Sequence, residues 1–269
     1  MEMDLLDIVL RILTGALIGF CIGMTGVGGG VILVPTLTLG FGMAPSVSVG
    51  TAILYTFLAK ISAVYHHVRL KTINYRTAWT FLIGAIPGSA VASWYVNHRA
   101  GSVLDEAASI QFQENLKFFI AAAMLASTGL LILNLVQTRI NRTPSEPGNR
   151  PDRVLLCMLL GAVVGAVVGS TALGAGILAI PVLLFCFRTA TSQTVGSSIF
   201  IGLMLTLISS FIYGKGGQIH ILTAVFMSLG AIPGVYYGSR MTVLLSEEKL
   251  KIVVIGLIAV ASFLMFFKQ

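Results

Sequence analysis

The sequence predicts an all-α, polytopic membrane protein made of two inverted repeats, each with five apolar helical segments. Of the 269 residues, 56% are hydrophobic and only 10% are charged, whereas a soluble domain carries about 25% charged residues. The charged residues cluster, and the apolar stretches between the clusters approach the roughly 20 residues that a helix needs to cross the hydrocarbon core. A repeat at an offset of 146 residues divides the chain into two halves.

Five apolar segments are expected in each half. In the first half they span about 5–23, 26–40, 47–66, 76–96 and 116–136, and in the second half about 154–170, 172–187, 194–213, 220–238 and 251–267. The chain thus divides into a first repeat over 1–138, a Pro-containing linker over 139–153 and a second repeat over 154–269, all in one integral membrane unit. The first two segments of each half are short and joined by a Gly-rich turn. Each such pair is either two spanning helices or a re-entrant hairpin.

The repeat consists mainly of glycines, prolines and small polar residues at matching positions. The motif Gly15-Ala16-x-x-Gly19-x-x-x-Gly23-x-Thr25-x-x-Gly28-x-Gly30 recurs as Gly161-Ala162-x-x-Gly165-x-x-x-Gly169-x-Thr171-x-x-Gly174-x-Gly176, and Gly84-Ala85-Ile86-Pro87-Gly88 recurs as Gly230-Ala231-Ile232-Pro233-Gly234. Shared apolarity alone would not reproduce glycine and proline so consistently. We assign the Gly-x-x-x-Gly spacings at 15–23 and 161–169 to close helix packing.

Basic residues predict the orientation of the two halves. An odd number of segments in each half gives the halves opposite orientations. With the N-terminus outside, the cytoplasmic loops hold Arg69, Lys71, Arg76, Arg139, Arg142, Arg150, Arg153, Arg188, Arg240, Lys249 and Lys251. The other side holds only Arg99, Lys117, Lys215 and Lys268, which fits the positive-inside rule. We therefore expect a multi-pass protein of the cell membrane with both termini outside and a cytoplasmic linker, and no nucleic-acid partner despite the net charge of +7.

The Gly-rich turns are the main candidates for a substrate site. The candidate residues are Thr25, Gly26, Gly28, Gly29 and Gly30 in the first half and Thr171, Gly174 and Gly176 in the second. The threonines are expected to be N-caps, and the first N–H groups of the helix after each turn lack partners and attract anions. Inverted repeats bring such helix ends together near the membrane midplane. The pattern predicts an electropositive pocket for a small oxyanion; the alternative is close packing through small residues.

A second set of polar residues recurs where the third segment of each half begins. Its candidate substrate-binding residues are Ser48, Thr51, Gln193, Thr194 and Ser197. Either these side chains donate hydrogen bonds to the anion oxygens, or they cap helices at the membrane edge. Pro87 and Pro233 lie inside the fourth segments, where each removes one helical hydrogen bond. Either they are hinges of a gating movement, or they are static bends that shape a cavity.

Acidic and sulfur-containing side chains give little sign of chemistry inside the membrane. Apart from Asp7 near one end, no Asp or Glu falls inside a segment, and buried carboxylates are what ion-coupled transporters often use. The cysteines at 21, 157 and 186 are dispersed and give neither a disulfide framework nor a metal spacing. No metal or cofactor is expected.

Three cationic or titratable residues near the third segment are interpreted as interfacial. Lys60 lies inside the segment and is expected to snorkel to the cytoplasmic interface, about two turns away. His66 and His67 lie at that interface next to Arg69 and Lys71. We interpret the histidines as polar residues of the interface rather than as a proton relay.

With these motifs, the chain resembles the sulfite exporter TauE/SafE family, also called the 4-toluenesulfonate uptake permease family. The resemblance rests on Gly23-x-Thr25-Gly26-x-Gly28-Gly29-Gly30-x-x-x-x-Pro35 and on the second copy Gly169-Ser170-Thr171-x-x-Gly174-x-Gly176-x-x-x-x-Pro181. It covers nearly the whole chain, although the second copy departs from the Gly-rich form through Ala172, Leu173 and Ala175. The resemblance implies transport of sulfite, sulfonates or related sulfur oxyanions.

The sequence thus predicts a secondary membrane transporter, not an enzyme, whose partners are a small sulfur-containing anion and the lipid bilayer. The alternative is an anion channel that uses the same pocket. A weaker alternative is an intramembrane enzyme that uses Cys21 or the histidines. The substrate, the direction of transport, the coupling ion and the oligomeric state stay open at this point.

Overall fold

The computed structural model describes residues 4–25, 30–101, 106–140, 153–187 and 191–241, together with 256 and 263. Its elements are α1 (Leu5–Thr25), α2 (Gly30–Pro35), the π-helical turn η1 (Thr36–Gly40), α3 (Pro45–Arg69), α4 (Tyr75–Gly101), α5 (Glu106–Ile140), α6 (Val154–Thr171), α7 (Ala175–Phe187), α8 (Thr191–Lys215) and α9 (Ile221–Met241). The described part contains no strand, so the predicted all-α class is confirmed. The predicted segment 251–267 and nearly all of the linker 139–153 lie outside the described residues.

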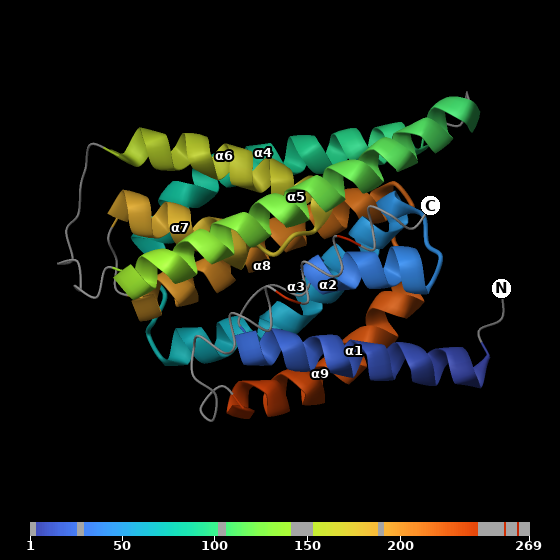
Figure 1. Cartoon of the computed structure of the whole chain (residues 1–269), viewed down its shortest axis with the longest axis horizontal. Coiled ribbons are helices and arrows are strands. Elements are labelled where there is room, and N and C mark those ends of the chain that lie inside the picture. Colours follow the sequence, from blue (N-terminus) through green and yellow to red (C-terminus); the bar gives the residue numbers. More distant parts are fainter. Residues whose placement is uncertain are drawn as a thin grey trace.

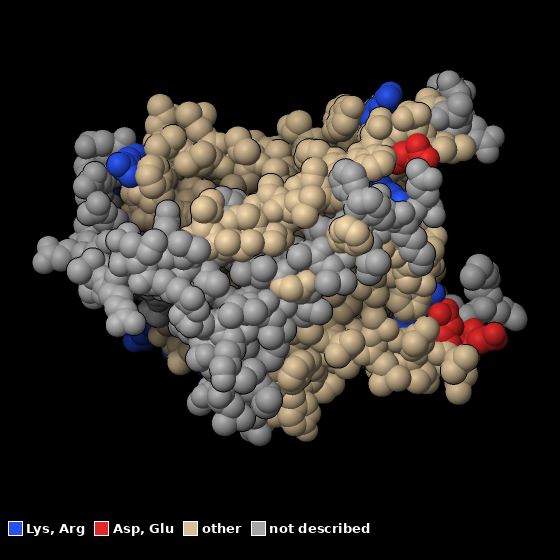
Figure 2. Space-filling view, viewed as in Figure 1, with Lys and Arg blue, Asp and Glu red and all other residues tan. Residues whose placement is uncertain are grey.

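Six of the described helices are long and apolar enough to cross a membrane: α1, α3, α4, α6, α8 and α9. Large apolar side chains on their outer faces are exposed, among them Leu13, Trp94, Leu159 and Ile232. A water-soluble protein rarely shows so much exposed apolar surface, whereas a lipid-facing surface requires it. On the face seen in Figure 2, the coloured charged side chains gather toward the two ends, and the tan surface between them shows none. The predicted polytopic membrane architecture is confirmed.

The helices run mainly along the long axis of the molecule (Figure 1). α1 begins at the end marked N, whereas α5 ends and α6 begins at the opposite end. The first helix of each half therefore starts from a different end. This arrangement agrees with the predicted opposite orientation of the halves, which itself remains a prediction.

The two halves are joined through pairs of long helices. α1 packs along α9 and α4 packs along α6, so the first helix of each half lies against the fourth helix of the other half. The third helices, α3 and α8, pack against each other. The long helices of each half therefore bury their packing faces against helices of the other half.

Glycines allow the paired backbones to approach closely. A Cβ on Gly15 would overlap Met227, and a Cβ on Gly161 would lie 2.6 Å from the Phe81 carbonyl oxygen. These two contacts are separated by 146 residues in both partners, as the sequence repeat would require. Gly19 on Ala231 and Gly165 on Ala85 form a second such pair of contacts. A two-fold relation between the halves would produce this pattern, and the predicted packing role of these glycines is confirmed.

The two Pro-Gly steps lie inside the helices of these pairs. Pro87 is in α4 and Pro233 is in α9, and each helix continues through its proline. A Cβ on the glycine that follows each proline would overlap the facing backbone, at the Ala162 carbonyl for Gly88 and at the Ala16 carbonyl for Gly234. The prolines thus lie beside the tightest helix contacts, and their role as hinges remains a prediction.

We predict that Gly165→Ala destabilises the protein because the added Cβ would overlap the Ala85 carbonyl oxygen between α6 and α4. Overpacking of this kind costs about 1–3 kcal/mol. Gly129→Ala in α5 is the matched control, since no atom lies within 4 Å of a Cβ built there. Thermal unfolding of the purified protein in detergent measures both changes. Equal melting temperatures for the two variants would contradict the packing role of Gly165.

Candidate functional site

The two Gly-rich turns meet in the interior of the molecule. Gly30, the first residue of α2, is buried, and a Cβ built on it would overlap the carbonyl oxygen of Ala172. Ala172 belongs to the turn between α6 and α7, so the first turn reaches the second through this contact. Gly26, Gly28 and Gly29 lie outside the described residues, as does the side chain of Thr25. The structure therefore describes the second turn in full and, of the first turn, only its last residue, Gly30, in detail.

The second turn is held in place by its own threonine. α6 ends at Thr171, and the next residue, Ala172, has a left-handed backbone with φ of 56°. The Thr171 hydroxyl donates to the Val167 carbonyl oxygen at 2.5 Å and accepts from the Leu173 amide at 3.2 Å. Every residue from 171 to 177 is buried. Thr171 thus supports the turn from the end of α6.

The predicted N-cap role of Thr171 is wrong. α7 begins at Ala175, four residues after Thr171. Thr171 is instead the last residue of the preceding helix, α6. Ala172, Leu173 and Gly174 lengthen this turn and separate the threonine from the start of α7. The residues that follow Thr25 lie outside the described part of the chain, so the N-cap role of Thr25 remains a prediction.

The start of α7 presents backbone N–H groups without acceptors. The Ile177 amide donates to the Gly174 carbonyl oxygen at 3.3 Å. For the amides of Ala175 and Gly176, the part of the chain that the structure describes offers no acceptor. The N-terminus of a helix carries roughly half a positive charge and is a ready site for an anion. The predicted residues Gly174 and Gly176 therefore lie where they would serve an anion site.

The two helices that flank this turn differ in length, since α6 has 18 residues and α7 has 13. Arg153, at the start of α6, donates to the carbonyl oxygen of Phe185 at 3.0 Å, and its guanidinium lies 4.5 Å from the centre of the Phe185 ring. The start of α6 and the end of α7 are therefore at the same side. The 13 residues of α7 span about 20 Å, which is less than the roughly 30 Å of the hydrocarbon core. α7 is too short to cross the layer by itself.

The second predicted set of polar residues forms hydrogen bonds with neighbouring helices. The Thr51 hydroxyl accepts from the His220 amide at 3.0 Å, just before α9, and the Ser197 hydroxyl accepts from the Asn74 amide at 2.9 Å, just before α4. The residue numbers of the two bonds again differ by 146. These bonds fix the entry into the fourth helix of each half. A part for either hydroxyl in substrate binding remains a prediction.

The other members of this set differ in their surroundings. Ser48 is buried and donates to the Met43 carbonyl oxygen at 3.3 Å. Thr194 is buried as well, whereas Gln193 is exposed. Ser48 lies in the first turn of α3, and Thr194 lies in the first turn of α8. Their predicted binding role is untested.

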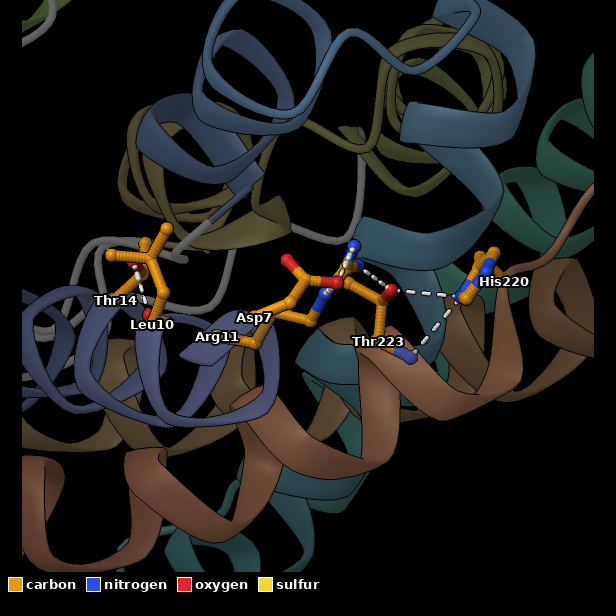
Figure 3. Close-up of polar contacts among 6 residues, drawn as sticks. All are labelled: Asp7, Leu10, Arg11, Thr14, His220 and Thr223. Atoms are coloured by element: carbon orange, nitrogen blue, oxygen red, sulfur yellow. Dashed lines mark hydrogen bonds and ion pairs between the residues drawn. The ribbon is translucent and has the colours of Figure 1, made fainter. Parts of the chain in front are cut away.

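A buried ionic cluster at the N-terminal end of the molecule was not singled out from the sequence. Figure 3 shows Asp7, Arg11, Thr223 and His220 in one chain of contacts. Arg11 is only 7% exposed; it pairs with Asp7 at 2.9 Å and donates to the Thr223 hydroxyl, which in turn lies 2.8 Å from His220 Nδ1. The spacing of Asp7 and Arg11, one helical turn apart, was the available sequence signal. The charge of Arg11 is balanced by Asp7 on the same helix. Its hydrogen bond to Thr223 connects α1 with α9.

Lys60 is the second cation inside the membrane-spanning part, and the expectation that it snorkels to the interface is wrong. Its side chain is only 9% exposed. A Cβ built on Gly202 would overlap the Lys60 Nζ, and Gly202 lies near the middle of α8. The missing side chain at Gly202 leaves room for the ammonium within the bundle, so the lysine does not have to extend toward the cytoplasmic end of α3.

Comparison with known proteins gives one consistent result. Residues 11–265 match the sulfite exporter TauE/SafE family. The probable membrane transporter protein YjnA of Bacillus subtilis (strain 168) is 30% identical over 253 residues, which cover 93% of this chain and 96% of the relative. The probable membrane transporter protein MJ0441 of Methanocaldococcus jannaschii is 26% identical, with 97% and 96% covered. No solved structure matches the chain.

The family match spans almost the entire chain and includes both Gly-rich turns and all the described helices except the start of α1. The relatives cover the same length and are themselves named as membrane transporters. Together with the six apolar helices, these findings identify the chain as a multi-pass membrane transporter that belongs to the sulfite exporter TauE/SafE family.

Proposed function

We propose that the protein is a secondary carrier for a small sulfur oxyanion, such as sulfite or a sulfonate, which binds where the two Gly-rich turns meet. The family description supports this substrate class. The named relatives support transport without specifying a substrate. The choice of an anion rests on the chemistry of the turns.

The observation that carries the proposal is the unpaired start of α7. The amides of Ala175 and Gly176 are buried and have no acceptor within the described residues. A buried N–H group without an acceptor is costly, especially where no water is available. The oxygens of a tetrahedral or pyramidal oxyanion would satisfy these amides. Gly30 lies against the carbonyl of Ala172, and it brings the first turn to the same place.

The arrangement of the halves supports a carrier mechanism. Contacts of the first half recur in the second at an offset of 146 residues, which is the relation expected for two halves that exchange positions during alternating access. We propose that the halves are inverted, that both termini lie outside and that the linker is cytoplasmic, in the cell membrane. In this mechanism Pro87 and Pro233 are symmetric hinges beside the α4–α6 and α1–α9 contacts.

The first prediction from this proposal is saturable uptake of sulfite or methanesulfonate into proteoliposomes that contain the wild-type protein. Gly29→Leu is expected to abolish uptake, because the proposal assigns substrate binding to the Gly-rich turns and a large side chain would compete with the substrate there. A failure of the wild type to take up any sulfur anion would remove the proposed substrate. Equal uptake by both proteins would make the turn a packing element.

An anion channel with the same pocket would be distinguished from a carrier by electrical recording in planar bilayers. A carrier is expected to show saturation and no unitary currents in planar bilayers, because each turnover requires a conformational change. Unitary anion currents would contradict the carrier mechanism and leave the site in place.

The second prediction concerns the hydroxyl of Thr171. Thr171→Val preserves the shape of the side chain but removes the acceptor of the Leu173 amide. The turn that presents the α7 amides would lose its support, so KM for sulfite uptake is expected to rise by roughly 3- to 10-fold, which corresponds to about one hydrogen bond. Thr171→Ser is the control, since it restores the hydroxyl. An unchanged KM in Thr171→Val would show that the turn does not position the substrate.

A further inference from the structure

Lys60 is a buried cation at the middle of the helical bundle. It lies on α3, its side chain is 9% exposed, and its Nζ lies against Gly202 of α8. The helix α8 extends from Thr191 to Lys215, so Gly202 is more than two helical turns from either end. The ammonium is therefore held away from both membrane surfaces.

No counter-charge among the described residues accompanies Lys60. Within the described residues it has neither a hydrogen-bond acceptor nor an ion-pair partner. The sequence contains no Asp or Glu between residues 8 and 104 or between 153 and 246, so α3, α4, α6, α7, α8 and α9 carry no carboxylate. A buried charge without a partner is strongly unfavourable, and an ionisable residue in this position indicates a functional site. Arg11, in contrast, is paired with Asp7.

Lys60 faces the start of α7. The Cβ position on Gly202 that Lys60 Nζ would overlap lies 3.4 Å from the Cβ of Ala175. Ala175 is the first residue of α7, and its amide is one of the two that lack acceptors. The ammonium and the positive end of a helix thus converge on the same point of α8. Two groups of the same sign are brought together without a negative group between them.

Thr56 adds a third unsatisfied group on the same face of α3. It lies one helical turn before Lys60, a spacing that places two side chains next to each other. Its hydroxyl is buried and has no hydrogen-bond partner among the described residues. A threonine inside a helix commonly bonds to the carbonyl four residues earlier, as Thr36 and Thr206 do. The Thr56 hydroxyl is therefore free to donate to another group.

We infer that Lys60, Thr56 and the amides at the start of α7 form the anion-binding site, and that the ammonium of Lys60 supplies its full positive charge. This inference rests on the proposed function and deepens it. One ammonium together with about half a charge from the helix end balances a monovalent oxyanion best. A sulfonate or hydrogensulfite group fits this description, with its oxygens accepting from Lys60 Nζ, Thr56 Oγ1 and the amides of Ala175 and Gly176.

The full positive charge of the site comes from the first half of the repeat alone. Lys60 corresponds to Thr206 in the second half, and Gly202 corresponds to Thr56 in the first. The larger side chain of Lys60 is thus matched by the absence of a side chain at Gly202. The charge is contributed once, at the centre, rather than twice by symmetry.

The test is direct binding of sulfite and of methanesulfonate to the purified full-length protein at constant ionic strength, measured by calorimetry and by thermal stabilisation. Lys60→Met is expected to reduce the affinity for both anions by at least about tenfold, because it removes a buried charged partner. The variant is expected to unfold at the same or a higher temperature without anion, since it also removes an unpaired charge. Lys60→Arg retains the charge and is expected to bind more tightly than Lys60→Met.

Two further variants separate binding from folding. Gly202→Ala would displace the ammonium without removing it and is expected to weaken binding, whereas Gly214→Ala on the same helix is the control, because its Cβ would be 3.7 Å from the nearest atom. Thr56→Val is expected to raise the stability of the anion-free protein while it lowers anion affinity. A purely structural Thr56 would give the opposite sign for stability and no change in affinity.

The outcomes distinguish this inference from the proposed function. Wild-type uptake together with unchanged anion affinity in Lys60→Met and Gly202→Ala would overturn the inference and leave the carrier in place. Anion binding that depends on Lys60, without uptake by the wild type, would support the site and remove the carrier. No binding of either anion by the wild type would overturn both.

Discussion

Backbone polar groups inside a membrane have no water to pair with, and this constraint organises the whole protein. Helices satisfy it along their length, so the chain crosses the layer as long apolar helices. The constraint is hardest to meet at a helix end that lies within the layer. α7 is too short to cross the layer by itself, and the amides of Ala175 and Gly176 at its start have no acceptor in the described part of the chain. The proposed substrate site lies at these amides, where an anion would supply the acceptors that the described part of the chain does not.

Helix packing holds this end in position from both halves. In lipid, helices associate through close contact rather than through burial of apolar surface. Gly15, Gly19, Gly161 and Gly165 let α1 approach α9 and α4 approach α6. Because these pairs join helices of different halves, neither half can move without changing its contacts with the other. In the proposed carrier mechanism, a rearrangement of the two pairs would expose the turns first to one side and then to the other.

The two buried cations illustrate how charge is used differently within one bundle. Arg11 lies near the N-terminal end, has Asp7 as its partner and connects α1 with α9 (Figure 3). Lys60 lies near the middle of the bundle and has no partner among the described residues. A paired cation stabilises a fixed contact, whereas an unpaired one favours the arrival of an anion. The difference follows from the positions of the carboxylates in the sequence, since Asp7 lies one helical turn from Arg11 and the α3 helix of Lys60 has none.

Much of the fold could be predicted from the sequence, because the period and length of apolar runs and the repeated glycines are properties of the chain itself. The helices through residue 238 and the packing role of Gly15 and Gly161 are confirmed. The N-cap role of Thr171 was predicted wrongly because its hydroxyl bonds to the Val167 carbonyl and the Leu173 amide within its own turn instead of capping α7. The position of Lys60 was predicted wrongly because Lys60 lies against Gly202, and spacing along one segment contains no information about a partner 142 residues away. The predicted residues Gly26, Gly28 and Gly29 lie outside the described part, so their role remains a prediction.

The most direct test of the central claim is to locate a bound anion. Selenite is a close analogue of sulfite, and its selenium atom can be located by anomalous diffraction from crystals of the full-length protein. The account predicts a single selenium peak within hydrogen-bonding reach of the Ala175 and Gly176 amides and of Lys60 Nζ. A peak at the hydroxyls of Thr51 or Ser197, or beside Arg11, with none at the start of α7, would contradict it.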